Sequence, residues 1–392
     1  MYNSAMVQPV TTLSASADKN GLQIGLFDDA EGLRAGLLGL SQTPGVGLQS
    51  LKKLYRTGFF LGLPSAPVED LVERAVKVLS GASLEGVREA LGNREKVMQR
   101  GRKVLGELRA AEIHVTFEHE KSFPRRLRDL AEPPLWIFYR GSLKAIWSRT
   151  AVALIGTRSP SDFGARLALN CGFHLATRGH VVLSGLARGI DQAAHEGCLE
   201  AGGITVAVLA QGLASDLSST AKSLANEAVA NEGAVVSEYL PFDPPNRSAF
   251  LRRNEIIAAL ARLVVPVEYP EVQSGTGATV RRAMAIKRPL AGISSSRFEG
   301  PASEATQRNL RSAGITVYDL HNGEAERFWT HVAKLVDARE AAENRRTLLG
   351  RRAEHFARLL AIEAKSRSMD PGEIDSFLDL LTKAVRRSIA GD

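Results

Sequence analysis

Short apolar runs alternate with segments of helical periodicity through the middle of the chain. The apolar runs predict strands at 151–155, 180–184, 204–209, 234–237, 262–267, 288–293 and 315–318. The intervening segments predict helices at about 162–178, 189–201, 219–232, 250–261, 277–286 and 303–313. This regular alternation is typical of an α/β fold with a mostly parallel sheet, right-handed crossovers and helices on both faces.

An N-terminal helical domain is expected at 22–106. Two short apolar segments flank the turn Thr43-Pro44-Gly45-Val46-Gly47, and Ser80-Gly81-Ala82-Ser83 separates two more. A Pro-Gly-x-Gly turn between helices resembles the helix-hairpin-helix module, related to SAM-type helical domains, in which turn N–H groups meet a nucleic-acid phosphate. The same turn also suits an αα-hairpin that needs glycine only for its conformation. Both interpretations stay open at this point.

The remaining segments complete the domain organisation. Residues 1–21 are polar, which predicts a disordered tail. Residues 107–147 are expected to be a connector with short strands at 114–117 and 133–141, the second an edge strand stopped by glycine. The sheet domain is expected at 148–322, and 323–392 is expected to be helical. For the arginines of 339–367 we favour a solvated helix face over a phosphate contact.

Composition narrows the possible classes of protein. A length of 392 residues favours two or three domains, and 44% hydrophobic residues indicate a chain that buries a core. The net charge of +7 fits either a mildly basic globular protein or one with a polyanionic partner. Cys171 and Cys198 offer no disulfide framework or zinc spacing, and no signal peptide or membrane span is visible, so a cytoplasmic location is expected.

Two turns at predicted strand ends carry small residues and an arginine. Gly156-Thr157-Arg158 follows the first strand, and Ser184-Gly185-Leu186-Ala187-Arg188-Gly189 follows the second. The carboxyl ends of parallel strands meet at one edge of a sheet, where ligands bind. Glycine permits close approach, threonine donates a hydroxyl and arginine binds phosphate. Asp191, in the first turn of the next helix, is expected mainly to cap it.

Two further turns are predicted to reach the same edge. Arg252-Arg253-Asn254 stands near the start of the helix predicted at 250–261, where the dipole disfavours two cations unless an anion binds there. Ser274-Gly275-Thr276-Gly277 opens the helix that follows the strand at 262–267. Four such turns favour a phosphate-lined groove over bare structural turns. The candidate binding residues are Gly156, Thr157, Arg158, Ser184, Gly185, Arg188, Gly189, Arg252, Arg253, Asn254, Ser274, Gly275 and Thr276.

Catalytic residues are not indicated. His174, His180 and His195 are scattered, no metal-ligand cluster is visible, and neither a Walker loop nor a dinucleotide fingerprint occurs. Glu238 and Glu268 stand at strand ends, where we expect them to orient N–H groups or arginines rather than act as acid and base. We therefore expect a binding protein with no cofactor and no metal.

The same segments closely resemble the DprA/Smf family of bacterial DNA-processing proteins over about 117–320. The matching segments are FPRRL, PPL, ALIGTRSPSDFG, VVLSGLARGIDQAAHEGCLEAGG, TVAVLAQGL, GAVVSEY, AFLRRNEIIAAL and VEYPEVQSGTGAT. The resemblance implies an extended Rossmann-like sheet, binding of single-stranded DNA, protection of incoming DNA, loading of the RecA recombinase and a homodimer. It further implies that Arg158, Ser184, Gly185, Arg188, Arg253, Asn254, Ser274 and Thr276 line the DNA pocket.

The chain also departs from this family's pattern. Residues 214–221 read ASDLSSTA in place of a Tyr-Pro-x-x-Asn segment, and Glu255 replaces an arginine. Ser274-Gly275-Thr276-Gly277 replaces a commoner Ser-Gly-Ser-Leu, and the C-terminal region does not resemble a winged helix. The alternative function is a nucleotide-processing or nucleotide-sensing enzyme of the phosphoribohydrolase type, with Glu268 as its closest catalytic candidate. A third possibility is a protein-interaction adaptor that has lost DNA binding.

Overall fold

The computed structural model describes residues 30–147, 151–294, 300–321 and 323–335. The chain divides into two compact units, Met1–Glu107 and Leu108–Asp392. The tail expected at 1–21 and most of the helical region expected at 323–392 lie outside the described residues. Each unit is considered by itself below.

The described part of the N-terminal unit is helical, as its periodicity predicts. Its helices are α1 (Ala30–Ser41), α2 (Leu48–Arg56), α3 (Phe59–Gly62), α4 (Val68–Val76), α5 (Gly81–Gly92) and α6 (Arg94–Ala110). Helices α1 and α6 cross with their backbones in contact, because both helices carry glycine at the crossing. A Cβ on Gly101 would lie 1.8 Å from the Ala35 carbonyl oxygen, and one on Gly39 would lie 2.0 Å from the Val97 carbonyl oxygen.

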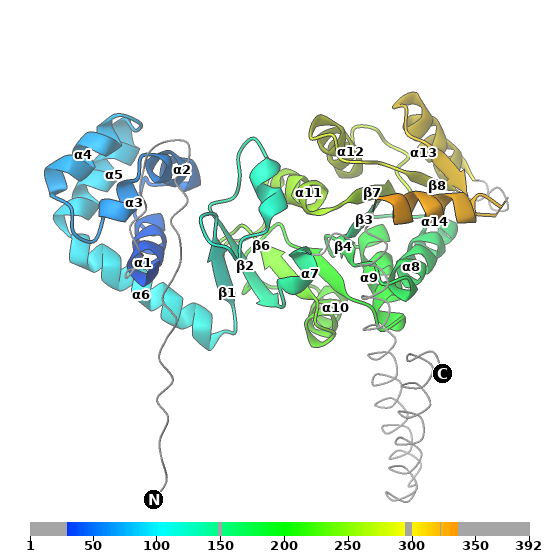
Figure 1. The fold of residues 1–392 in the computed structure, drawn as a ribbon, viewed down its shortest axis with the longest axis horizontal. Coiled ribbons are helices and arrows are strands. Elements are labelled where there is room, and N and C mark those ends of the chain that lie inside the picture. The colour runs from blue at the N-terminus through cyan, green and yellow to red at the C-terminus, as the bar shows by residue number, and fades with distance from the viewer. Residues whose placement is uncertain (1–29, 148–150, 295–299, 322, 336–392) are drawn as a thin grey trace, which may run out of the picture. The chain divides into compact units, whose positions relative to one another are not determined.

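A seven-stranded sheet forms the centre of the second unit, in the order β1-β2-β6-β5-β4-β3-β7 (Figure 1). Its strands are β1 (His114–Phe117), β2 (Trp136–Gly141), β3 (Val152–Ile155), β4 (Val182–Ser184), β5 (Thr205–Val208), β6 (Ala234–Ser237) and β7 (Leu263–Pro266). Strands β3 to β7 pair in parallel, while β1 and β2 are antiparallel to their neighbours. The predicted mostly parallel α/β sheet is confirmed.

The sheet differs from the prediction at both ends. The segment 133–141 was expected to give an edge strand, yet β2 lies between β1 and β6. The Trp136 indole N–H donates to the Glu238 carbonyl oxygen at 2.9 Å, which ties β2 to the end of β6. The last two predicted strands, β8 (Gly292–Ser294) and β9 (Val317–Asp319), form a separate parallel pair that meets the main sheet through one bridge, Val264 to Leu290.

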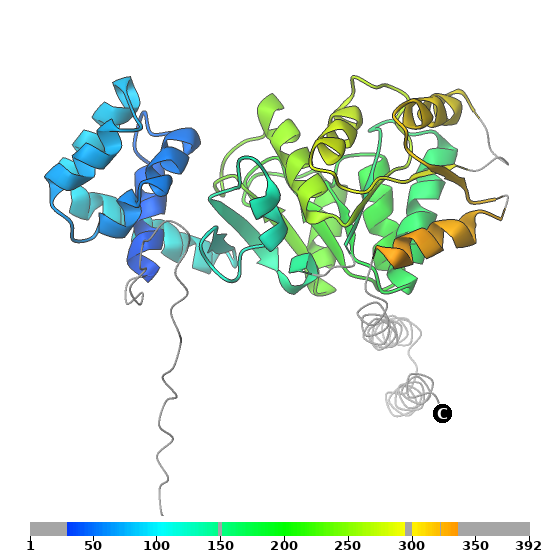
Figure 2. The same cartoon turned by 45° about the horizontal axis from the view of Figure 1, so that its top comes forward.

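Helices cover both faces of the sheet, as Figures 1 and 2 show. The helices of this unit are α7 (Lys144–Trp147), α8 (Asp162–Thr177), α9 (Ile190–Glu200), α10 (Ser219–Ala230), α11 (Arg247–Leu260), α12 (Gly275–Ala285), α13 (Pro301–Ser312) and α14 (Ala325–Lys334), with a 3₁₀ turn at Arg125–Asp129. Alternate residues of β3 point to opposite faces, as a strand requires: Ala153 and Ile155 pack with α11 and α12, while Val152 and Leu154 pack with α8 and α9.

The strand order reverses beside β3. From β3 the chain proceeds through β4, β5 and β6 on one side, and then returns to place β7 on the other side of β3. The loops that follow β3 and β7 therefore diverge to opposite faces of the sheet, leaving a crevice at the carboxyl ends of these two strands. In open α/β sheets this switch point is the usual place for a ligand.

Candidate functional site

A pocket of about 510 Å³ lies at this switch point. Residues from the β3 and β7 loops, from α11 and from the start of α12 converge on it. They are Ile155, Gly156, Thr157, Arg158, Ala187, Asp191, Arg247, Phe250, Leu251, Arg253, Asn254, Ile257, Gln273, Ser274, Gly275, Thr276, Ala278, Thr279 and Arg281. Each of the four predicted turns thus contributes at least one residue to the lining of the pocket, although some predicted binding residues do not line it.

Three exposed arginines line the pocket: Arg158, Arg247 and Arg281. The Arg158 guanidinium lies 4.7 Å from the centre of the Phe250 ring, so this ring holds the cation over the pocket. Arg281 Nη1 donates to the Val272 carbonyl oxygen at 2.8 Å, which positions its side chain next to the α12 N-terminus. These side chains make the pocket electropositive.

Arg253 is the buried cation of this site, with only 5% of its surface exposed. Its Nη1 lies 3.3 Å from Asp191 Oδ2, which also accepts a hydrogen bond from the Gly185 N–H at 3.2 Å. Burial lowers the pKa of Arg253, and Asp191 counteracts part of this effect. Within the described residues Arg253 Nε has no hydrogen-bond partner. A second anion in the pocket would therefore stabilise this buried guanidinium.

The N-terminus of α12 forms one wall of the pocket. Ser274 is the N-cap: its Oγ accepts from the Gly277 N–H at 3.2 Å and donates to the Glu271 carbonyl oxygen at 2.6 Å. Asn254 Nδ2 donates to the Gly275 carbonyl oxygen at 3.1 Å and so joins α11 to this turn. The first N–H groups of an α-helix have no acceptor within the helix, so those of Gly275 and Thr276 suit an anion.

Four predicted residues from the β4 turn and α11 serve the scaffold instead. Ser184 is buried and donates its hydroxyl to the Leu154 carbonyl oxygen at 2.6 Å. Gly185 lies under Arg253, where a Cβ would come within 0.9 Å of Nη1. Gly189 has φ +92°, a conformation that favours glycine. None of these three lines the pocket, and neither does Arg252, considered next.

The prediction that Arg252 and Arg253 stand at a helix N-terminus is wrong. Helix α11 begins at Arg247 with Asn246 as its N-cap, so both arginines lie inside the helix. Successive helical residues differ by about 100° in direction, and the two side chains therefore separate. Arg252 pairs with Glu238 and Glu255 and donates to the Glu132 carbonyl oxygen. Glu255, which replaces a cation expected from the family pattern, thus has a structural partner.

Arg188 lies beside the pocket without lining it. Its Nε donates to the Arg158 carbonyl oxygen at 3.3 Å and its Nη2 donates to Ser159 Oγ at 3.3 Å. The side chain is exposed and braces the loop that presents Arg158. Arg188 therefore has an observed structural contact, and a direct contact with a ligand stays a prediction.

Several lining residues were not among the predicted binding residues, and three of them can contact a phosphate or a base: Arg247, Phe250 and Arg281. Arg247, Phe250 and Asn254 are spaced i, i+3 and i+7, which places them on one face of α11. This helical spacing was the available signal, and it required the correct start of the helix. Arg281 lies about two turns after the N-cap Ser274, so its place beside the pocket likewise depends on where the helix begins.

The acidic residues near strand ends are engaged in the scaffold. Both oxygens of Glu268 lie near the Ser161 backbone N–H, at 3.1 and 3.3 Å, and Oε2 accepts from Ser161 Oγ at 2.8 Å. The expectation that Glu238 and Glu268 orient N–H groups or arginines is confirmed by these contacts and by the Arg252 pair. Asp191 does not cap α9 as predicted, because the N-cap Gly189 has no side-chain cap hydrogen bond; it accepts from the Gly185 N–H and neutralises Arg253 instead. Among the residues described, no group of three His, Cys, Asp or Glu side chains is arranged for a metal.

His195 lies behind the site and provides a test of its electrostatics. Its Nδ1 is 2.6 Å from Thr205 Oγ1, whose hydroxyl donates to the Val182 carbonyl oxygen. Burial, aided by Arg253, lowers the pKa of His195 to about 3. The unfolded chain therefore takes up a proton near pH 6.5 that the folded chain does not, so this contribution to stability is complete above pH 6.5 and is lost on acidification.

We expect the free energy of unfolding to fall by about 2–3 kcal/mol between pH 6.5 and 4.5 through His195 alone. Urea unfolding of the native chain and of His195→Gln at several pH values measures it. The variant should lose that much less stability over the same range. Equal losses in both proteins would contradict the assignment.

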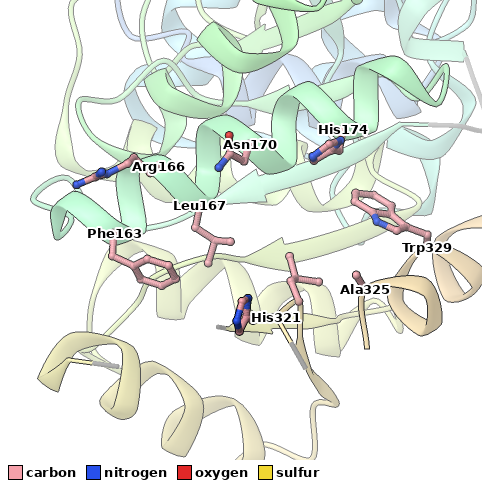
Figure 3. A pocket seen from close by; sticks show the side chains of 9 residues that line it. Phe163, Arg166, Leu167, Asn170, His174, His321, Ala325 and Trp329 are labelled. Atoms are coloured by element: carbon pink, nitrogen blue, oxygen red, sulfur yellow. The ribbon is translucent and has the colours of Figure 1, made fainter. Parts of the chain in front are cut away.

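A second pocket, of about 470 Å³, lies between α8 and α14 (Figure 3). Phe163, Leu167 and Trp329 give it largely apolar walls, and His174 lies next to Trp329, with the two ring centres 6.2 Å apart. Arg166 is the one lining cation within the described residues. This pocket lacks the converging arginines of the switch-point pocket and is the weaker candidate for a phosphate ligand.

Fold and pocket together define a Rossmann-like α/β protein with a cation-lined crevice at the switch point of its sheet. Residues 114–322 match the family described as DNA recombination-mediator protein A. The match covers more than half of the 392 residues, and the chain belongs to this family.

Individual relatives agree with this assignment. The chain is 36% identical over 180 residues to Protein Smf of Synechocystis sp., covering 45% of each chain. It is 34% identical over 205 residues to Protein Smf of Escherichia coli, covering 52% of this chain and 54% of the relative. The chain therefore matches about half the length of these curated relatives. Its fold is similar to the X-ray structure of DNA processing protein A (DprA) from Streptococcus pneumoniae, with a TM-score of 0.55 and 25% sequence identity. This structural match covers 73% of this chain and 94% of the Streptococcus pneumoniae chain.

Proposed function

We propose that this chain binds single-stranded DNA by its backbone phosphates in the switch-point pocket and acts as a recombination mediator. The observation that carries the proposal is Arg253, a buried guanidinium with one carboxylate partner and an unpartnered Nε within the described residues. It lies beside three exposed arginines and a helix N-terminus in the same pocket. Phosphates are the sequence-independent feature of a nucleic-acid strand, and such a pocket matches them in charge and hydrogen bonding.

The pocket also favours an unpaired strand over a free inorganic anion. Phe250 and Leu251 line it, and 51% of the Leu251 surface is exposed. Apolar and aromatic side chains beside cations provide stacking surfaces for bases whose faces are free. The proposed contacts are those of Gly156, Thr157, Arg158, Arg253, Asn254, Ser274, Gly275 and Thr276, extended by Arg247, Phe250 and Arg281.

Membership of the DNA recombination-mediator family supports the wider role. We infer that the chain protects incoming single strands, loads RecA onto them and works as a homodimer without catalysing a reaction. Strand exchange by RecA on DNA covered with single-strand-binding protein tests the loading step. Addition of this chain should shorten the lag before strand exchange, and an unchanged lag would contradict loading.

Among the described residues, no helix is both long and apolar enough to cross a bilayer.

Arg158→Ala is the direct test of the pocket. Loss of one charged phosphate contact should weaken binding of a labelled single strand about tenfold and reduce the slope of log affinity against log salt by about 0.7. Fluorescence anisotropy at several salt concentrations measures both quantities. Arg166→Ala is the matched control, because it removes the same charge from an exposed arginine beside the other pocket.

Equal binding by the native chain, Arg158→Ala and Arg166→Ala would overturn the proposal. So would release of free base from nucleoside monophosphates by a chain that binds no DNA, which would instead favour the phosphoribohydrolase type of enzyme. Glu268 would then have to leave its contacts with Ser161 to reach a substrate.

A further inference from the structure

A groove of about 660 Å³ lies within the N-terminal unit, between the turn at 43–44 and helix α6. Its lining is mostly polar and includes three cationic side chains. The lining residues are Thr43, Pro44, Glu89, Ala90, Asn93, Lys96, Gln99, Arg100 and Lys103. We propose that this groove is a second DNA-binding site, which holds the phosphate backbone independently of the pocket in the sheet.

The turn that forms one side of the groove is held in place by α5. Gly45 has φ +79°, and a Cβ on Gly86 of α5 would lie 2.6 Å from the Pro44 carbonyl oxygen. Ser83 Oγ donates to the Gly45 carbonyl oxygen at 2.8 Å. These contacts fix the turn from its inner side. Its position is therefore set before any ligand arrives, which lowers the entropic cost of binding.

The opposite side of the groove is a row of cations on one face of α6. Lys96, Arg100 and Lys103 are spaced i, i+4 and i+7. At 1.5 Å per residue this row extends about 10.5 Å along the helix. Glu89 is the acidic residue of the lining, and Lys103 Nζ also lies 3.7 Å from Glu107 Oε1, so three cations face two carboxylates. Within the described residues, the hydrogen bond of the Arg100 side chain is a long 3.5 Å contact with the Gln42 carbonyl oxygen.

Thr43 supplies an independent indication of a ligand. This side chain lines the groove with 8% of its surface exposed, and its Oγ1 has no hydrogen-bond partner in the described part of the chain. An unsatisfied buried hydroxyl costs about 1–3 kcal/mol. Rotation of the Thr43 side chain toward the groove would let a phosphate oxygen accept this hydrogen bond while the α6 cations neutralise its charge.

The chemistry of the lining selects a backbone rather than a base. As far as the described residues extend, the groove contains no aromatic ring on which a base could stack. A single strand and a duplex offer the same phosphates, so the experiment includes both. Two interpretations were given for the turn Thr43-Pro44-Gly45-Val46-Gly47: a structural hairpin and a nucleic-acid contact. They are compatible, because the packed hairpin forms one side of the groove.

The test uses the full chain with Lys96→Gln, Arg100→Gln and Lys103→Gln combined. The matched control combines Lys77→Gln, Arg88→Gln and Arg102→Gln, which removes the same charge from exposed positions of this unit outside the groove. Binding of labelled single-stranded and duplex oligonucleotides is measured at two salt concentrations. The groove variant should bind at least one of them tenfold more weakly than the control, with a salt slope smaller by about 2–3. Equal binding by both variants would overturn the proposal.

Thr43→Val separates binding from folding. Valine has a similar shape and removes an unsatisfied hydroxyl, so the melting temperature should stay the same or rise while DNA binding weakens. A lower melting temperature, or unchanged binding, would contradict the role given to Thr43.

Comparison with Arg158→Ala separates this site from the pocket in the sheet. Loss of binding in the groove variant but not in Arg158→Ala would retain the N-terminal site and refute the pocket. The reverse result would refute the groove and retain the pocket.

Discussion

Asp191→Ala is expected to lower the free energy of unfolding of the sheet unit by about 3–5 kcal/mol. The substitution leaves Arg253 as a buried cation without its carboxylate, and it also deprives the Gly185 N–H of its acceptor. Urea unfolding followed by tryptophan fluorescence measures the loss. Trp136, Trp147 and Trp329 are the only tryptophans of the chain and all lie in Leu108–Asp392, so their emission reports this unit alone.

Two further variants identify the cause of that loss. Asp191→Leu combined with Arg253→Met replaces the pair with apolar side chains and should recover most of the stability, since neither charge stays buried without a partner. If the proposed pocket binds a strand, a saturating oligonucleotide should raise the stability of Asp191→Ala more than that of the native chain. A loss below about 1 kcal/mol would mean that water solvates the Arg253 cation, which would contradict the burial of a side chain with only 5% of its surface exposed.

Gly197→Ala is expected to destabilise the same unit by about 3 kcal/mol or more, although it adds a single methyl group. Helices α8 and α9 cross with their backbones in contact: a Cβ on Gly197 would lie 1.9 Å from the Leu169 carbonyl oxygen, and one on Gly172 would lie 2.3 Å from the Ala194 carbonyl oxygen. A rotamer change cannot relieve a clash with backbone, so the helices must separate. Thermal unfolding followed by far-ultraviolet circular dichroism measures the loss.

Gly106→Ala is the control for the glycine prediction. Gly106 is inside α6, and a Cβ there would meet no atom of the residues that the structure describes within 4 Å. The same substitution should therefore stabilise its helix by about 0.5–1 kcal/mol through helix propensity. Similar effects at Gly106 and Gly197 would show that propensity, and not the close crossing, controls both positions.

The parallel part of the sheet could be predicted because its signals are local. Strands β3 to β7 lie within the predicted apolar runs. Each run was recognisable because it alternates with a segment of clear helical periodicity. The position of β2 could not be predicted, because its partner β6 is far along the chain and no local pattern records that pairing. The separation of β8 and β9 from the main sheet could not be predicted for the same reason. Their apolar patterns are those of ordinary strands, and only tertiary packing places them in a separate pair.

The site was predictable in its parts and not in its detail. Residue type and strand-end position correctly located Arg158 and Ser274 at one pocket, which Asn254 reaches from inside α11. The difference between Arg252 and Arg253 depends on where α11 begins, and a shift of three residues reverses the argument from the helix dipole. The pair between Arg253 and Asp191 joins residues 62 positions apart, and nothing in either local sequence announces it.

The position of β2 also affects how the chain matures on the ribosome. Trp136 and Phe138 are buried in the finished protein, and β2 becomes an interior strand only when β6 pairs with it. Residues 142–233 are translated in between. At a synthesis rate of about 5–20 residues per second, β2 and its aromatic side chains therefore lack the β6 partner for roughly 5–20 s. During that interval the nascent chain exposes apolar surface of the kind through which folding intermediates aggregate, and truncation before Ala234 would leave β2 permanently without its β6 partner.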